Sequence, residues 1–340
     1  MPAGPHVLVS VTLVRHEEKQ LIAALRDRGA TVTVAKLADL AQVLNGAARL
    51  PDPAQVLNGA GRSPDLAQVS NGAARSPDLA LIRNLAHSEA VEATRRLAAI
   101  GVPTLNSADA VSLCGDKGQQ ALLYARLGIP HPRSYLAYDL DQVTALVAEL
   151  GRAVIKPVSA SWGRGLARVT DAATLECWAA GRESVDAAGR HFPVLVQQYL
   201  DKPGYDLRVV VVGTEPVAAV RRVSAHWRTN THLGATVERT ELTVQVRRLV
   251  AGVVRHLGPG FYGVDIVVEA GTDRLFVLEV NANPEFARSA PVHGVDIAGL
   301  LARHVLELCG SAGHGPGRVT DHGAGHAAGH DTDHELPRAA

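Results

Sequence analysis

Residues 263–281 read GVDIVVEAGTDRLFVLEVN, two apolar runs that are joined by a short turn around Gly271. Side chains alternate across a strand, so Glu279 and Asn281 project to one face of the second run, opposite its apolar residues. Asp265, in the first run, is able to reach the same face. Three hard oxygen groups that lie close together fit Mg²⁺ that bridges nucleotide phosphates. A solvent-facing sheet edge would carry the same polar residues, and this stretch alone does not choose between the two interpretations.

A second stretch, residues 153–169 (AVIKPVSASWGRGLARV), predicts a strand that ends at Lys156, a short loop and a returning strand. The loop holds two serines and two glycines: Ser159, Ser161, Gly163 and Gly165. Glycine lets backbone N–H groups approach phosphate oxygens, and hydroxyls and a lysine add donors and positive charge. A Walker A loop would lead into a helix and needs Gly-Lys-Ser/Thr, so it is excluded. A plain hairpin turn explains the stretch as well as a phosphate loop does.

Around these two stretches, short apolar runs alternate with helical patterns, which predicts an α+β unit with antiparallel strands. The expected strands are Val194–Gln198, Leu207–Val212, Pro216–Val220, Tyr262–Val268 and Leu275–Val280, and the expected helices are 140–150, 241–257 and 296–309.

The first 113 residues predict a separate α/β domain. Residues 7–14 and 31–35 are strand-like and flank a helical pattern at 17–28, which is a β-α-β opening. No Gly-x-Gly-x-x-Gly follows the first run, so a dinucleotide site has little support there.

An internal repeat interrupts this domain at residues 39–77. Near-identical units start at Asp39, Asp52, Asp65 and Asp78, each 13 residues after the last. Each complete unit carries Asn-Gly and Pro, which are turn residues, so we expect an expanded surface loop, with a binding arm as the alternative. Residues 311–340 hold five histidines and almost no large apolar residue, so we expect a disordered tail that only loosely binds metal, if at all.

Composition limits the partners and the compartment. The 34 basic residues equal the 34 acidic ones, so no overall field favours nucleic acid or an anionic membrane. Apolar runs are shorter than the roughly 18–20 residues of a membrane span, and the three cysteines form no CxxC, so we expect a cytoplasmic protein with reduced cysteines. Only five basic residues are lysines: Lys19, Lys36, Lys117, Lys156 and Lys202. Each place where this arginine-rich chain uses lysine is therefore of interest.

Three longer segments connect these features to a known family. They are residues 197–213 (QQYLDKPGYDLRVVVVG), 223–231 (VSAHWRTNT) and 279–297 (EVNANPEFARSAPVHGVDI). Together with the stretch around Lys156 they resemble the ATP-grasp superfamily, its RimK-like branch, and most closely LysX-type ligases. The resemblance runs from about residue 114 to 310. It implies an ATP-grasp fold after an N-terminal α/β (pre-ATP-grasp) domain, with a central lobe at 114–198 and a C-terminal lobe at 199–310.

The resemblance implies a nucleotide site, position by position. Lys117 and Lys156 match the lysines that contact ATP phosphates, and the loop at 159–165 matches the one over the β- and γ-phosphates. The loop residues concerned are Ser159, Ser161, Trp162, Gly163 and Gly165. The hinge that reads the adenine edge matches Gln197, Gln198, Tyr199 and Leu200. Asp206 matches the carboxylate on the ribose side.

Other matched positions imply metal and substrate contacts. Asp265, Glu279 and Asn281 match magnesium ligands. Arg208 matches a phosphate or substrate contact, Arg222 the arginine that steadies the transferring phosphoryl group, and Asn230 a substrate-side asparagine. Positive charge concentrates around residues 221–239, where arginine forks suit carboxylates. We expect the substrate to meet His226, Trp227, Arg228, Thr229 and Glu285.

The implied activity is that of a carboxylate–amine ligase that uses Mg²⁺ and ATP. A substrate carboxylate would attack the γ-phosphate, and an amine would then displace phosphate from the acyl phosphate. LysX-type ligases join an amino acid such as α-aminoadipate or glutamate to the C-terminal glutamate of a small acidic carrier protein (LysW-like), in lysine, arginine or secondary biosynthesis. The alternatives are a RimK-type glutamate ligase acting on another protein or peptide, and a non-catalytic nucleotide-binding module. The resemblance also implies a homo-oligomer.

Overall fold

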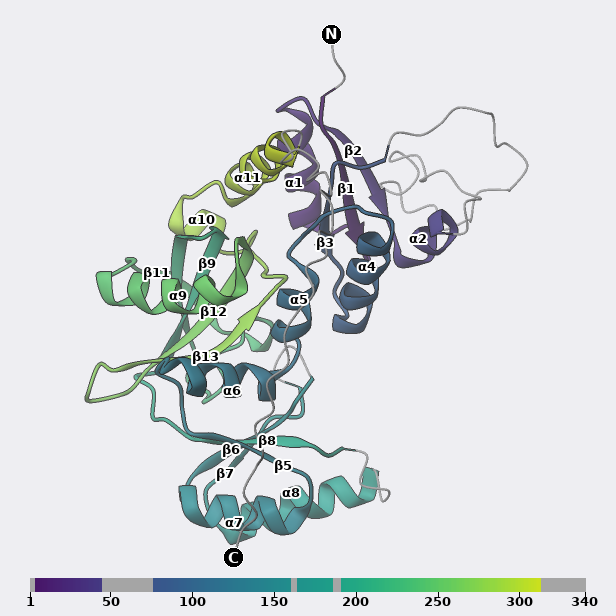
Figure 1. The fold of residues 1–340 in the computed structure, drawn as a ribbon. Coiled ribbons are helices and arrows are strands. Elements are labelled where there is room, and N and C mark those ends of the chain that lie inside the picture. Colours follow the sequence, from purple (N-terminus) through teal and green to yellow (C-terminus); the bar gives the residue numbers. More distant parts are fainter. Residues whose placement is uncertain (1–3, 45–75, 160–163, 186–190, 313–340) are drawn as a thin grey trace, which may run out of the picture.

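The computed structural model describes residues 4–44, 76–159, 164–185 and 191–312. Three features of the sequence analysis fall outside these ranges: most of the repeats, the histidine-rich tail from residue 313, and the loop residues Ser161, Trp162 and Gly163. The described elements form three sheets with their helices (Figure 1).

The first sheet confirms the β-α-β opening. It is parallel, with strand order β2-β1-β3-β4. Its elements are β1 (His6–Val11), α1 (His16–Arg26), β2 (Thr31–Ala35), α2 (Leu37–Leu44), β3 (Leu79–Arg83), α4 (His87–Ala99), β4 (Thr104–Leu105) and α5 (Ala108–Cys114). Both neighbours of the buried strand β1 are thus in place, although the repeats separate them in the chain.

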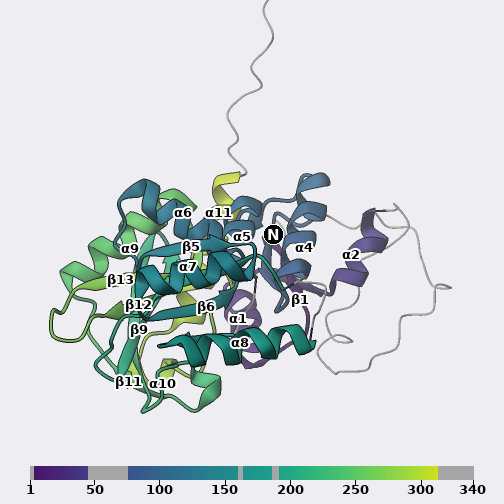
Figure 2. The ribbon, with the colours of Figure 1, turned by 90° about the horizontal axis from the view of Figure 1, so that it is seen from below.

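The second sheet is antiparallel, with strand order β5-β8-β6-β7. This central lobe consists of α6 (Lys117–Leu127), β5 (Ser134–Ala137), α7 (Leu140–Leu150), β6 (Ala153–Pro157), β7 (Ala167–Val169), α8 (Ala172–Val185) and β8 (Val194–Gln198). Helices α7 and α8 cover one face of the sheet (Figures 1 and 2), and apolar residues of both helices pack on Ile155 and Val196.

The third sheet is also antiparallel, with strand order β11-β10-β9-β12-β13, which confirms the expected α+β organisation. Its elements are β9 (Tyr205–Gly213), β10 (Glu215–Val223), a 3-10 turn (Thr231–Leu233), β11 (Thr236–Arg239), α9 (Val244–Leu257), β12 (Gly260–Val268), β13 (Leu275–Asn281), α10 (Ala290–His293) and α11 (Ile297–Ala312). Apolar residues of α9 pack on one face of this sheet.

The opposite face of the third sheet shares a core with the N-terminal sheet. One apolar cluster joins Val7 and Leu81 of the first sheet, Val210 and Phe261 of the third, and Leu301 of α11. Helix α11 lies beside α1 in Figure 1. The sequence analysis groups α11 with the C-terminal lobe, and in the structure this helix packs both on β9 of that lobe and on α1 and β3 of the N-terminal domain.

None of the helices that the structure describes is both long and apolar enough to cross a membrane.

Candidate active site

Strand register gathers the charged residues of the third sheet on one face. The register pairs Arg222 with Asp206, Arg208 with Asp265, and Asp265 with Glu279. Residues that pair across antiparallel strands point to the same face, and so do residues two apart along a strand. The same alternation turns Val209 and Val211 toward the opposite face, into the core beneath α9. One strand pattern therefore builds both the core and a charged surface.

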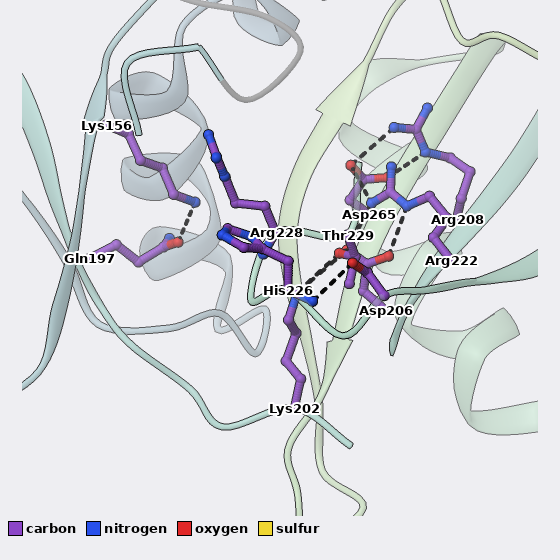
Figure 3. Close-up of polar contacts among 11 residues, drawn as sticks. Lys156, Gln197, Lys202, Asp206, Arg208, Arg222, His226, Arg228, Thr229 and Asp265 are labelled. Atoms are coloured by element: carbon purple, nitrogen blue, oxygen red, sulfur yellow. Dashed lines mark hydrogen bonds and ion pairs between the residues drawn. The ribbon is translucent and has the colours of Figure 1, made fainter. Parts of the chain in front are cut away.

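Two aspartates and two arginines form a buried network on this face (Figure 3). Arg222 donates two hydrogen bonds of 2.8 Å to the carboxylate of Asp206 and lies 3.0 Å from Asp265. Arg208 donates to both carboxylate oxygens of Asp265, with Nη2 at 3.0 Å from Oδ2. Thr229 donates its hydroxyl proton to Asp206. The four charges balance, which permits their burial.

The ion pairs set the charge states of this network. Burial alone would raise the pKa of Asp265, but the charges of Arg208 and Arg222 lower it below the usual value. Burial alone would lower the pKa of Arg222, but Asp206 and Asp265 raise it. Asp265 and Arg222 therefore stay ionised at neutral pH as long as the network is intact.

The absence of a side chain at Gly263 leaves space for the guanidinium of Arg208. A Cβ atom at this position would lie 2.9 Å from Nη1 of Arg208 and 2.8 Å from Cβ of Pro284. A larger residue would therefore displace the guanidinium that holds Asp265.

Lys156 faces this network from the central lobe (Figure 3). It is buried on β6, and its Nζ donates to Oε1 of Gln197 at 2.6 Å. The amide of Gln197 in turn donates to the hydroxyl of Ser134 at 2.9 Å. Burial lowers the pKa of Lys156 to about 8, although the charge of Glu279 opposes this shift. The partner in direct contact is a neutral amide, so the ammonium is available to an anionic ligand.

Lys117 lies at the start of α6, directly against β13. Asp116 caps the helix by accepting from the N–H of Gln119 at 2.9 Å, and the N–H of Lys117 donates to the carbonyl of Val158 at 3.1 Å. Its Nζ is 3.7 Å from a carboxylate oxygen of Glu279. The structure thus brings together an expected phosphate lysine and an expected metal ligand.

The hinge residues differ in what they offer a ligand. The N–H of Gln198 donates to the carbonyl of Arg133 at 2.8 Å, and that of Tyr199 to the carbonyl of Arg152 at 2.9 Å. Among the described residues, the N–H of Leu200 has no such partner. It is therefore the hinge donor that remains open for a purine edge.

A cavity of about 690 Å³ opens beside the network. Six of the expected site residues line it: Arg208, Arg222, Asn230, Glu279, Asn281 and Glu285. The volume is in the range typical of small-molecule sites. Neither Lys117 nor Lys156 lines this cavity.

The segment at 223–231 splits between two locations. Asn230 lines the main cavity, and Thr229 is buried against Asp206. Trp227 and Arg228 instead line a hollow of about 440 Å³ that β7 and α8 complete, and the Trp227 ring packs edge-on to Tyr199 at 6.5 Å. His226 is exposed. Only part of this segment therefore lines the main cavity.

The phosphate loop is described only at its ends. Ser159 is exposed. Gly165 has φ +68°, and a Cβ there would lie 2.7 Å from Cγ of Pro157. Its carbonyl accepts from Nη2 of Arg182 at 3.1 Å.

The expected magnesium ligands are on one face but are not equally accessible. Within the described residues, no three His, Cys, Asp or Glu side chains gather closely enough to hold a metal ion. Mg²⁺ is usually held by one or two carboxylates, with water and substrate phosphates as the remaining ligands. Glu279 and Asn281 line the cavity and fit that requirement, and the amide of Asn281 donates to Glu279 at 3.4 Å. Asp265 does not line it, because both its oxygens accept from arginines.

Sequence reasoning missed several residues of the site. The N-terminal domain contributes Arg15, Glu17, Asn84 and His87 to the main cavity, and no motif marks them. The sequence analysis named Lys202 among the five lysines but gave it no role, although its Nζ donates to Thr229 at 3.0 Å and lies 4.0 Å from Asp206. The scarcity of lysine in the chain is the signal that could have identified Lys202.

Comparisons with known proteins agree with this architecture. The model of the RimK-like ATP-grasp domain matches residues 114–305. The α-aminoadipate–LysW ligase LysX of Sulfurisphaera tokodaii is 30% identical over 228 residues, which are 66% of this chain and 79% of that protein. The ribosomal protein bS6–L-glutamate ligase of Shigella flexneri is 32% identical over 219 residues, 63% of this chain and 70% of that protein. The crystal structure of a RimK domain ATP-grasp protein from Sphaerobacter thermophilus superposes with a TM-score of 0.65 at 24% identity and covers 88% of this chain and 98% of its own.

Proposed function

The chain belongs to the RimK-like ATP-grasp family of ATP-dependent ligases, and we propose that it joins the amino group of an amino acid to the carboxylate of a carrier protein. One observation carries the proposal. The main cavity lies between the N-terminal domain and the charged face of the third sheet, where Arg208, Arg222 and Glu279 line it together. Such a cavity holds a carboxylate and an amine next to a phosphoryl donor.

The residues of the chain position the reactants and neutralise charge. Lys156 and Lys117 bind the phosphates of ATP, and Leu200 donates its N–H to the adenine edge. Arg222 and Arg208, held by Asp206 and Asp265, face the transferring phosphoryl group. Phosphoryl transfer depends mainly on such positioning and on electrostatic stabilisation, and it needs no enzyme nucleophile.

The bonds change in two steps. An oxygen of the substrate carboxylate attacks the γ-phosphorus, the bond between the β-bridging oxygen and the γ-phosphorus breaks, and ADP leaves. The amine then attacks the carbonyl carbon of the acyl phosphate, inorganic phosphate leaves, the amine loses a proton, and an amide remains. Glu279 and Asn281 would hold Mg²⁺, which supplies charge neutralisation at the phosphates when it is bound.

A LysW-type carrier with a C-terminal glutamate is the acceptor that we propose. This choice rests on the LysX relative, whose name states its amino acid and its carrier. The arginines of the cavity also suit an acidic acceptor tail.

A coupled assay of ADP release tests the function. The full chain is incubated with Mg·ATP, a LysW-type carrier, and either α-aminoadipate or glutamate. The mass of the carrier is then measured by mass spectrometry. We expect ADP release that depends on the carrier and a mass gain of one amino-acid residue. ADP release without any carrier, or a product formed on an unrelated glutamate-ending peptide, would favour a RimK-type ligase. No ADP release with any acceptor would contradict the ligase assignment of this site.

A further inference from the structure

Three charged residues link the N-terminal domain to the main cavity. Arg15 precedes α1 and lines the cavity, Glu18 lies in the first turn of that helix, and Arg83 ends β3. The carboxylate of Glu18 is fully buried and accepts hydrogen bonds from both arginines. The sequence analysis assigned no function to any of the three.

Arg83 anchors this group between the domains. Its side chain is 1% exposed, and its guanidinium packs against the rings of Phe261 and Phe286 at 5.4 and 5.8 Å. It also donates to the carbonyl of Pro284 at 3.3 Å. Since these contacts belong to the third sheet and to the segment after β13, Arg83 holds Glu18 at a defined place relative to the cavity.

Glu18 in turn fixes the orientation of Arg15. Nε of Arg15 donates to Oε2 of Glu18 at 3.0 Å, and Nη2 donates to Oε1 at 2.7 Å. Burial alone would raise the pKa of Glu18, but the bond from Arg15 and the charge of Arg83 lower it, so the carboxylate stays ionised. Among the described residues, Nη1 of Arg15 has no hydrogen-bond partner, and the side chain keeps 24% of its exposure, on the wall of the cavity.

The part of the Arg15 guanidinium that faces the cavity suits an anionic ligand. Two guanidinium groups share the single carboxylate of Glu18. Glu17 and Glu285 also act on Arg15 electrostatically. Because Arg83 is buried, Arg15 is the guanidinium of this group that reaches the cavity. A guanidinium that already donates along one edge still has N–H donors on another edge, and these can pair with a carboxylate. Glu17 also lines the cavity, so the wall carries both signs, as a site for a zwitterion requires.

We propose that Arg15 binds the carboxylate at the far end of the amino-acid side chain, with Glu18 and Arg83 as its positioning residues. The proposal rests on the proposed function, because the amine of that amino acid must lie near Arg208 and Arg222, on the wall formed by the third sheet. The N-terminal domain then selects dicarboxylic amino acids, while the two ATP-grasp lobes carry out phosphoryl transfer.

Binding measurements on the full chain test this assignment without any acceptor. Isothermal titration of L-glutamate and L-glutamine is carried out in Mg·AMPPNP, with L-α-aminoadipate as a longer dicarboxylate. We expect the wild-type protein to bind the dicarboxylates more tightly than glutamine. Arg15→Ala should weaken binding of the dicarboxylates about 10- to 100-fold and leave that of glutamine nearly unchanged, because one charge-assisted hydrogen-bonded contact is lost.

A matched variant controls for the loss of a surface arginine. Arg96 on α4 makes a 2.7 Å pair with Glu92 and does not line the cavity, so Arg96→Ala should bind as the wild type does. The affinity for AMPPNP should stay the same in Arg15→Ala, since an effect on the nucleotide would mean that Arg15 binds phosphate. Equal weakening for glutamate and glutamine, or no preference in the wild type, would overturn the proposal.

The positioning roles of Glu18 and Arg83 must be tested by ligand affinity and not by stability alone. Glu18→Gln keeps the shape of the side chain but loses its charge, so Arg15 becomes mobile and we expect a smaller, dicarboxylate-specific loss of about 3- to 10-fold. Arg83→Lys should restore part of the affinity that Arg83→Met loses. If these variants only lower the melting temperature and keep the glutamate preference, Glu18 and Arg83 are structural, and the orientation argument is wrong. ADP release by wild-type protein, measured separately, reports on the proposed function, so the two can fail independently.

Discussion

The third sheet and the central lobe hold their charges in opposite ways. In the third sheet, Asp206, Arg208, Arg222 and Asp265 bond to one another and balance. In the central lobe, Lys156 is equally buried but contacts a neutral amide. A self-paired network keeps its geometry without a ligand, whereas a buried ammonium beside an amide gains most when an anion arrives. The sheet therefore supplies shape, and the central lobe supplies an unbalanced charge for the phosphates.

Substitution of Glu279 should have the largest effect of all and is the most severe test of this comparison. It faces the cavity and lies 3.7 Å from Lys117, between the two regions. We expect Glu279→Gln to lower kcat for ADP release about 1,000-fold or more, because the loss of a metal ligand removes several kcal/mol of transition-state stabilisation. Glu269→Gln, at the exposed turn beside Arg274, is the control and should keep wild-type turnover. Wild-type turnover in Glu279→Gln would mean that the metal site is misplaced.

Arg222 tests the self-paired network. Arg222→Met leaves Asp206 and Asp265 buried with less compensation, so the free energy of unfolding should fall by about 3–5 kcal/mol. Urea denaturation followed by circular dichroism measures the change. Arg274→Met, which removes an arginine that is mostly exposed, should cost less than about 1 kcal/mol. Similar losses in the two variants would show that the network does not act as a buried unit.

The pH dependence of nucleotide binding tests whether the unbalanced charge of Lys156 binds phosphate. Its pKa is about 8, lowered mainly by burial, so its charge disappears as pH rises through this value. If the charged form binds phosphate, the Kd for Mg·ATP should rise about eightfold between pH 7.5 and pH 9. Lys156→Met should weaken binding about 10- to 100-fold at pH 7.5 and remove this pH dependence. A pH profile that the substitution leaves unchanged would assign the titration to another group.

The contribution of Lys156 to stability should change with pH in the opposite direction. Higher pH should weaken nucleotide binding but raise the contribution of Lys156 to the free energy of unfolding. Between pH 8 and the ordinary lysine value of 10.5, the unfolded chain keeps a proton that the folded chain has lost. The unfolded state then binds more protons, so the contribution of Lys156 to the free energy of unfolding rises with pH in this window. Urea titrations of wild type and Lys156→Met at pH 7.5 and 9.5 measure it, and the difference between the two proteins should change between the two pH values.

The smallest effect should come from the repeats, which belong to neither region. Deletion of residues 52–77 removes two whole units and keeps Asp78, whose N–H and carboxylate bond to His6 at the start of β1. Loop closure entropy changes slowly with length, so the free energy of unfolding should shift by less than about 1 kcal/mol. ADP release should also stay near the wild-type rate. Insoluble protein after this deletion would show that the repeats are structural.

The sequence predicts four of the five strands of the third sheet, all but β11, because their signal is local. Alternation in residues 263–281 places Asp265 and Glu279 on one face, and the register confirms it. Apolar runs also mark β8 and β9 closely. Period-2 patterns of this kind survive folding because each strand buries a face along its whole length.

Helix α6, for which the sequence analysis made no prediction, shows a burial pattern that residue type alone does not reveal. Its Leu122 is 71% exposed, whereas Gln120 is 3% exposed and donates to the carbonyls of Cys114 and Val280. An apolar pattern would place Leu122 inside and Gln120 outside, but the buried amide of Gln120 satisfies backbone carbonyls of α5 and β13. Arg15 was missed for a related reason: Glu18, which orients it, is itself held by Arg83, 65 positions after Glu18, and no local motif encodes that contact.

The core that α11 shares with the first sheet constrains when this protein can fold during synthesis. Val7, Leu81 and Leu301 belong to one apolar cluster, so the N-terminal domain lacks part of its interior until residues 297–312 have been made. Domains usually fold in order as they leave the ribosome. Here the α/β domain, which precedes both ATP-grasp lobes in the chain, is completed only by α11, so part of its apolar interior lacks a partner while both lobes are synthesised.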